Sequence, residues 1–158
     1  MLTPFDPLAF LDQTTETALE RRPPVPALDY LATIQDLTSK PWQSKDKYNE
    51  DGTLKSGLQF EITLELQLPP EVQEACKIQK LTLTDRPLID LTPDRQAIDY
   101  SVGKNGRLRQ YREATGLNVP GQPFSPRMLV GRLVKVRVSH EEYQGNIQER
   151  AGAIGKAA

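Results

Sequence analysis

The side chains best suited to chemistry in this sequence are cations that occur beside aromatic rings. Three stretches hold both kinds of residue. The candidate contacts are Lys40, Trp42, Lys45, Lys47 and Tyr48 in the first, Tyr100, Lys104, Arg107 and Arg109 in the second, and Arg132, Lys135, Arg137 and Tyr143 in the third. Cations bind the phosphates of a single strand and flat rings stack on its bases, at roughly 1–3 kcal/mol per stacked base. The pattern therefore predicts a surface that binds nucleic acid.

Two of these cations are the most firmly placed at the surface. Val134, Val136 and Val138 alternate with Lys135 and Arg137. Alternate side chains of a strand point to opposite faces. Because the valines are expected to point into the core, the two cations must point outward.

Some of the aromatic residues have another interpretation. Trp42 could cap an open end of the fold rather than bind a ligand. Tyr111 lies among the arginines of the second stretch, but its spacing from Leu108 favours a place in the core.

Groups for catalysis or metal binding are scarce. Cys76 is the only cysteine and His140 the only histidine, which excludes an intrachain disulfide, a Cys-rich zinc site and most His-based sites. A nucleophile–base pair of these two is disfavoured, because Cys76 lies in the polar segment EACK and His140 ends a strand. The chain also lacks the GxxxxGK[ST] phosphate loop. We therefore expect no catalytic residue, no metal and no cofactor.

One enzyme class remains a third option. Asp85, Asp90, Asp94 and Asp99 could be imagined as the Mg²⁺ ligands of a nuclease. Their spacing fits neither one face of a strand nor a known ligand loop.

Composition limits the fold and the compartment. The chain has 158 residues, 37% of them hydrophobic, and 13 prolines, which favours one small β domain over a helical bundle. It has no apolar run of the roughly 18–20 residues that a membrane span needs, and its N-terminus lacks the features of a secretory signal. With one cysteine, a reducing cytoplasm is the expected compartment.

Charge is divided unevenly along the chain. Residues 1–102 hold 10 basic and 17 acidic side chains, whereas residues 103–150 hold 9 basic and 4 acidic ones. Such a division favours one face that meets an anionic polymer and another that avoids it.

The sequence pattern of the first half of the chain predicts an arm followed by a hairpin. Asp6 and Pro7 begin a helix that ends at three prolines, so residues 1–26 form an N-terminal helical arm with a proline-rich connector. Residues 28–37 and 58–68 alternate as strands, and residues 41–57 are predicted to be a flexible hairpin loop. We expect the arm to pack across the main domain, with docking on a partner as the alternative.

The sequence pattern of the second half of the chain predicts short strands and one helix. The expected elements are a helical turn at 71–77, a kinked strand at 77–91, a helix at 106–115 and a final hairpin at 133–154. Strands joined by hairpins pair antiparallel. The fold class is therefore mainly β: a five-stranded antiparallel Greek-key barrel of the oligonucleotide-binding (OB) type over residues 27–158, with one helix before the last hairpin.

The order of several motifs resembles a known group of proteins. FDPLAFLDQTTE followed by PPVPALDYLATI, the segment DLTPDRQAIDYSVGKNGRLRQYREATGLNVPGQPFS, and LVGRLVKVRVSH are similar to small bacteriophage proteins encoded among replication genes. The ending EEYQGNIQERAGAI resembles that of phage single-stranded-DNA-binding proteins with the OB fold.

This resemblance implies a phage protein for DNA replication or recombination. It would bind single-stranded DNA largely without sequence preference, in the cytoplasm of the host bacterium. The chain ends without the acidic tail by which bacterial single-strand binders recruit partners, so the acidic N-terminal arm is the better candidate for contacting phage replication or recombination proteins. A homodimer is compatible with this class.

A rival from another class is a protein-interaction module on a small β-barrel. A virion component or an inhibitor of a host enzyme would fit it, because fold does not fix function. It is favoured if the basic strand face packs against the arm or a subunit.

Overall fold

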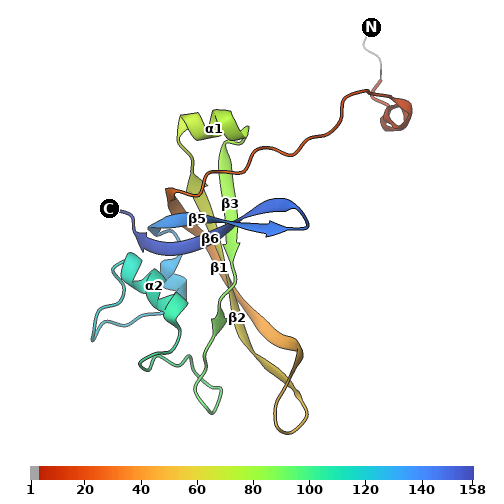
Figure 1. Ribbon diagram of the computed structural model, residues 1–158. Coiled ribbons are helices and arrows are strands. Elements are labelled where there is room, and N and C mark those ends of the chain that lie inside the picture. The colour runs from red at the N-terminus through yellow and green to blue at the C-terminus, as the bar shows by residue number, and fades with distance from the viewer. Residues whose placement is uncertain (1–3) are drawn as a thin grey trace.

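The computed structural model describes residues 4–158 as a mainly β protein (Figure 1). Its strands are β1 (Asp29–Tyr48), β2 (Leu54–Gln67), β3 (Lys80–Asp85), β4 (Leu88–Ile89), β5 (Leu133–Tyr143) and β6 (Asn146–Lys156). They form one antiparallel six-stranded sheet in the order β3-β2-β1-β5-β6, with β4 also paired to β2. The helices are α1 (Pro70–Cys76) and α2 (Gly106–Ala114), with short 3-10 helices η1 (Pro7–Asp12) and η2 (Pro126–Leu129).

The β1–β2 hairpin is the longest part of the sheet and differs from the sequence prediction. Its inner half is as expected, since Phe60, Ile62 and Leu64 are all buried. The predicted loop at 41–57 is wrong, because pairing continues to Tyr48 opposite Leu54. Antiparallel pairing is made by backbone groups, so it persists where both faces are polar and the hydrophobic alternation has ended.

The β5–β6 hairpin confirms the predicted final hairpin. Val134, Val136 and Val138 are fully buried, as their alternation indicates. The strands are joined by Gln144 and Gly145, whose φ angles are 51° and 78°. Two positive φ angles are what a tight type I′ turn requires, so two residues are enough to join β5 to β6.

Helix α2 confirms the predicted helix at 106–115. Leu108 and Tyr111 are buried in the core, and Gly116 follows with a φ of 74°, the left-handed conformation expected after a helix. Tyr111 is therefore a core residue, as its spacing from Leu108 indicates.

The sheet is not closed into the predicted barrel. Within residues 4–158, β3 and β6 form the two edges and no ladder joins them, although the two strands are in contact. A side chain of α2 spans the gap: Arg107 Nε lies 2.7 Å from Asp85 Oδ2 on β3, and Arg107 Nη2 donates to the carbonyl of Ala151 on β6 at 3.2 Å. The contacts of Arg107 on helix α2 thus join β3 to β6, where a closed barrel would have hydrogen bonds between the two strands.

The arm does not form the predicted long helix. Asp6 accepts a hydrogen bond from the Leu8 amide as a cap, but the helix ends at Asp12 and the chain then runs extended. Thr14, Thr15 and Thr17 have weak helix propensity, and no neighbouring surface supplies the packing that usually stabilises a short helix. Residues 1–3 of the predicted arm lie outside the described residues.

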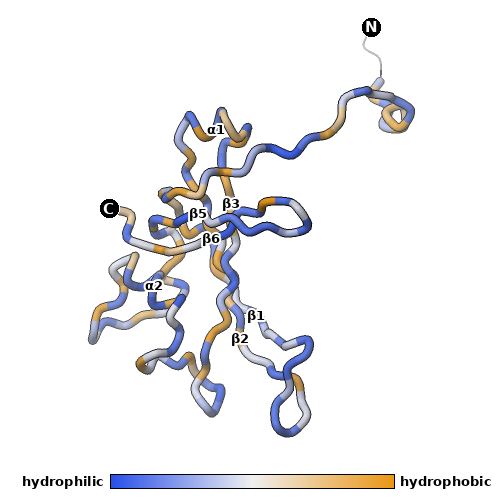
Figure 2. The backbone as a smooth tube through the Cα atoms, viewed as in Figure 1, coloured by the Kyte–Doolittle hydropathy of each residue, from blue (hydrophilic) through white to orange (hydrophobic). Residues whose placement is uncertain are grey.

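The prediction that the arm packs across the main domain is also wrong. Every residue from Pro4 to Arg21 is exposed, and Figure 2 shows apolar segments of this arm away from the body. The connector is held at its end instead. Val25 is fully buried, Arg22 pairs with Glu149 at 2.8 Å, and His140 Nε2 lies 2.6 Å from the Val25 carbonyl oxygen. The arm therefore leaves the body from a fixed point.

Candidate nucleic-acid interface

The first predicted stretch places an indole on the outer face of the β1–β2 hairpin. Trp42 is half-buried and lies directly opposite Gly57 in the β1–β2 pairing. A Cβ on Gly57 would lie 4.0 Å from Trp42 Cε3, an ordinary van der Waals distance, so the ring lies beside the Gly57 backbone. The indole helps to line a cavity of about 310 Å³ whose other walls include Leu88, Leu91 and Arg95.

One cation shares the cavity of this indole, and another lies near it on β1. Lys40 is two residues before Trp42 on the same face of β1 and pairs with Glu61, which also lies 3.5 Å from Arg86. The hydrogen bond from Lys40 is the largest cause that lowers the pKa of Glu61. Arg95 is fixed by a hydrogen bond from its Nη1 to the Ser56 carbonyl at 3.3 Å. Trp42, Gly57, Lys40 and Arg95 are called the indole platform below.

The remaining residues of the first stretch lie at the far end of the hairpin. Lys45, Lys47 and Tyr48 are exposed, and Tyr48 keeps 60% of its surface accessible. The backbone there is irregular, with the Lys47 amide donating to the buried Ser44 hydroxyl at 3.0 Å. These side chains belong to strand β1 and not to a loop, but none of them lines the cavity of Trp42.

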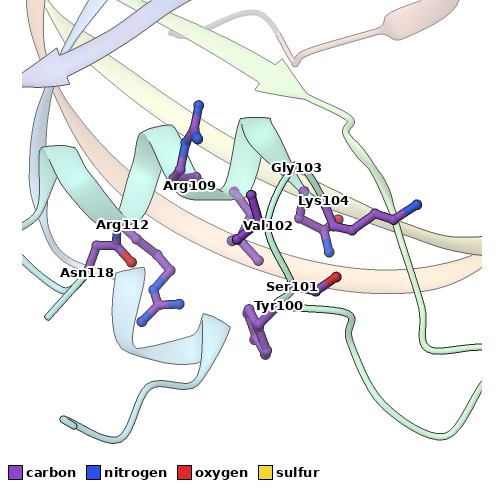
Figure 3. A pocket seen from close by; sticks show the side chains of 10 residues that line it. Tyr100, Ser101, Val102, Gly103, Lys104, Arg109, Arg112 and Asn118 are labelled. Atoms are coloured by element: carbon purple, nitrogen blue, oxygen red, sulfur yellow. The ribbon is translucent and has the colours of Figure 1, made fainter. Parts of the chain in front are cut away.

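The second stretch is divided between surface and interior. Tyr100, Lys104 and Arg109 line a cavity of about 260 Å³ at the start of α2. Figure 3 shows Arg112 pointing towards Tyr100, whereas Lys104 and Arg109 point away from that ring. The cavity is therefore lined by cations that do not converge on one point.

Arg112 is occupied by aromatic neighbours. Its guanidinium lies 4.1 Å from the ring centre of Phe124 and 5.5 Å from that of Tyr100, and Nη2 donates to the Leu117 carbonyl at 3.2 Å. Burial raises the pKa of Tyr100, and the nearby Arg112 charge opposes that rise.

Arg107 lies in an internal network. Besides its contacts to Asp85 and Ala151, its Nη1 donates to Gln110 at 2.9 Å, and Tyr111 Oη donates to Asp85 Oδ2 at 2.6 Å. Burial, with the neighbouring Asp85 charge, raises the pKa of Tyr111. The Arg107 side chain is thus committed to joining α2, β3 and β6.

The third stretch lies on β5 and its hairpin. Lys135 and Arg137 are exposed, as their alternation with valines predicts, and Arg137 lies 3.7 Å from Asp29. Arg132 is exposed just before β5, and Tyr143 is 58% exposed at the tip of the β5–β6 hairpin.

The structure does not gather all the predicted contacts in one cavity. Trp42 shares a cavity with Arg95, and Lys40 and Arg86 both pair with Glu61. Sequence reasoning missed Arg86 and Arg95. Tyr100, Lys104 and Arg109 share another cavity. Of the missed arginines, Arg86 directly follows the last residue of β3, and Arg95 lies in the turn between Leu91 and Ile98. A turn signal such as Pro93-Asp94 beside a cation could have indicated Arg95.

The residues considered for catalysis are engaged elsewhere. Among residues 4–158, no three His, Cys, Asp or Glu side chains form a group that could hold a metal ion. Asp94 and Asp99 accept hydrogen bonds from Thr92 and Ser101, which lower the pKa values of both carboxyl groups. Cys76 is buried.

Fold and site together define a mainly β protein with an antiparallel sheet and a half-exposed indole between cations. A scan against protein families and a search of curated protein sequences both returned no match. In residues 4–158, none of the helices is long and apolar enough to cross a membrane.

Proposed function

We propose that this protein binds single-stranded DNA, largely without sequence preference, in phage DNA replication or recombination in the host cytoplasm. The observation that carries the proposal is the indole platform. Its ring lines a cavity together with Arg95, and Lys40 lies two residues before it on β1. In the proposed complex a base stacks on the indole, and the two cations bind neighbouring phosphates. We assign it no catalytic group, metal or cofactor.

We also propose that the fold is of the Greek-key OB type. Three consecutive antiparallel neighbours, β1 to β3, are joined by a hairpin and by a connection that contains α1. Strand β5 then returns beside β1, which gives the order β5-β1-β2-β3. Helix α2 precedes the last hairpin and fills the opening between β3 and β6, where an OB barrel would close. In that fold, strand faces and the hairpins beside them bind oligonucleotides, which agrees with the position of the platform.

A direct test uses the fact that Trp42 is the only tryptophan. Titration with oligo(dT) should quench tryptophan fluorescence as a base stacks on the indole. The anisotropy of a labelled oligo(dT) should report the same affinity, and binding should weaken steeply with salt because counterions are released. Absence of binding at low salt would remove the proposal. Binding without quenching would place the interface away from the platform.

The second candidate function is a protein-interaction module. Its supporting observation is the arm, on which Phe5, Leu8, Phe10 and Leu11 are all more than half exposed. Exposed apolar clusters of this kind mark interaction sites. The oligonucleotide titration separates the two, because only the first candidate requires affinity for oligo(dT).

A further inference from the structure

The arm carries apolar and acidic side chains with no partner in its own chain. The rings of Phe5 and Phe10 lie 5.6 Å apart beside the exposed Leu8 and Leu11. Residues 1–20 contain four acidic residues and neither lysine nor arginine. The segment therefore needs a surface that is apolar at its centre and positively charged at its rim.

A groove of that chemistry lies on the β1–β2 hairpin next to the cavity of Trp42, with which it shares Leu58, Leu91 and Arg95. A cavity of about 450 Å³ is lined by Pro41, Leu58, Leu91 and Ile98, with Lys40 and Arg95 among its walls. Its volume falls in the range of about 300–1,000 Å³ that is typical of binding pockets. No Asp or Glu is among the described residues that line it. We call this cavity the Pro41 groove.

The arm and the groove lie at opposite ends of one molecule. The arm leaves the body beside α1, whereas the β1–β2 hairpin extends away from α1 (Figure 1). The connector is fixed by the buried Val25 and the Arg22–Glu149 pair. Docking in its own groove would require the arm to turn back over the whole body, so a second copy is the simpler occupant.

We propose that the acidic arm of one copy docks in the Pro41 groove of the next copy. The Phe5–Leu11 segment would fill the apolar centre, and its carboxylates would face Lys40 and Arg95. Because arm and groove are different surfaces, the contact is heterologous, and repetition builds a ring or an open chain of copies. The inference does not depend on the binding of DNA.

The test measures the assembly of the full chain without DNA by sedimentation velocity over a range of concentrations. Wild-type protein should form species larger than a monomer, in a salt-sensitive manner. Phe10→Ser in the arm and Ala97→Glu in the groove should each leave a monomer at ten times the concentration at which wild type is half assembled. Both residues are exposed, so neither change disturbs the core.

A matched control and a mixing experiment make the test specific. Ala75→Glu adds the same charge at an exposed position on α1 and should assemble like wild type. A mixture of the Phe10→Ser and Ala97→Glu proteins should form a one-to-one complex that grows no further, because only one intact arm and one intact groove remain.

Three results would overturn the proposal. They are a wild-type monomer at every concentration, continued assembly of the Ala97→Glu variant, and failure of the two variants to pair. Lys40 and Arg95 belong to both the groove and the indole platform. Because no oligonucleotide is present in this experiment, failure of assembly is still distinguished from failure of DNA binding, which the oligo(dT) titration measures separately.

Discussion

Two arginine–aromatic pairs in this molecule have opposite surroundings. At the α2–β3 junction, Arg107 and Tyr111 both contact Asp85, and the tyrosine is fully buried. On the β1–β2 hairpin, Arg95 and Trp42 border a cavity that is open to solvent. The comparison shows that the same residue types hold the fold together where a carboxylate faces them in the interior, and that they line an open cavity where they lie at the surface.

The largest effect should come from removing the buried ring. Tyr111→Ala deletes a fully buried aromatic side chain and should lower the free energy of unfolding by about 3–5 kcal/mol. Urea denaturation followed by circular dichroism measures this. A loss below about 1 kcal/mol would mean that α2 is not part of the core.

The next effect separates two arginines of the same helix. Arg107→Ala leaves the Asp85 carboxylate without its charged partner and should cost roughly 1.5–3 kcal/mol of unfolding free energy. Arg109→Ala is the matched control, because Arg109 is exposed and forms only a surface pair with Glu113, worth about 0.3–0.5 kcal/mol. Equal losses in the two variants would contradict the internal role of Arg107.

On the open side of the comparison, Trp42→Ala should affect binding more than stability. Loss of one stacked base should weaken oligo(dT) binding by roughly 1–3 kcal/mol, measured by anisotropy of the labelled strand. Tyr143→Ala is the control, since this exposed ring lies at the tip of the other hairpin and should change affinity little. A larger loss from Tyr143→Ala would move the interface to β5–β6.

The smallest effect is a pH dependence. The pKa of Tyr111 is raised in the folded protein, so the unfolded chain loses this proton first, near the ordinary tyrosine pKa of about 10. The stability that this group contributes is therefore present below that pH and lost as pH rises above it.

Tyr111→Phe tests this directly. It removes one hydrogen bond to Asp85 and should cost on the order of 1 kcal/mol at neutral pH. The difference from wild type should narrow above about pH 10, because only wild type loses the tyrosine contribution there. A constant difference across the alkaline range would exclude this ionisation as a cause.

The elements with regular patterns could be predicted from sequence. The leucines of β2, the valines of β5 and the Leu108–Tyr111 pair of α2 each bury the face that their period indicates. The hairpin beyond Lys40 could not be predicted in this way, because polar strand pairs carry no hydrophobic period. The arm was wrongly predicted as a helix, since its apolar residues have no surface within the chain to pack on.

The sequence by itself determined the antiparallel strands, the α2 helix and the outward position of Lys135 and Arg137, because each follows from neighbours within a few residues. Only the tertiary structure decided that Arg107 faces Asp85, that Trp42 lies over Gly57 and that β3 and β6 stay unpaired. Those outcomes depend on residues that are distant in the chain, and local patterns carry no information about which of them meet.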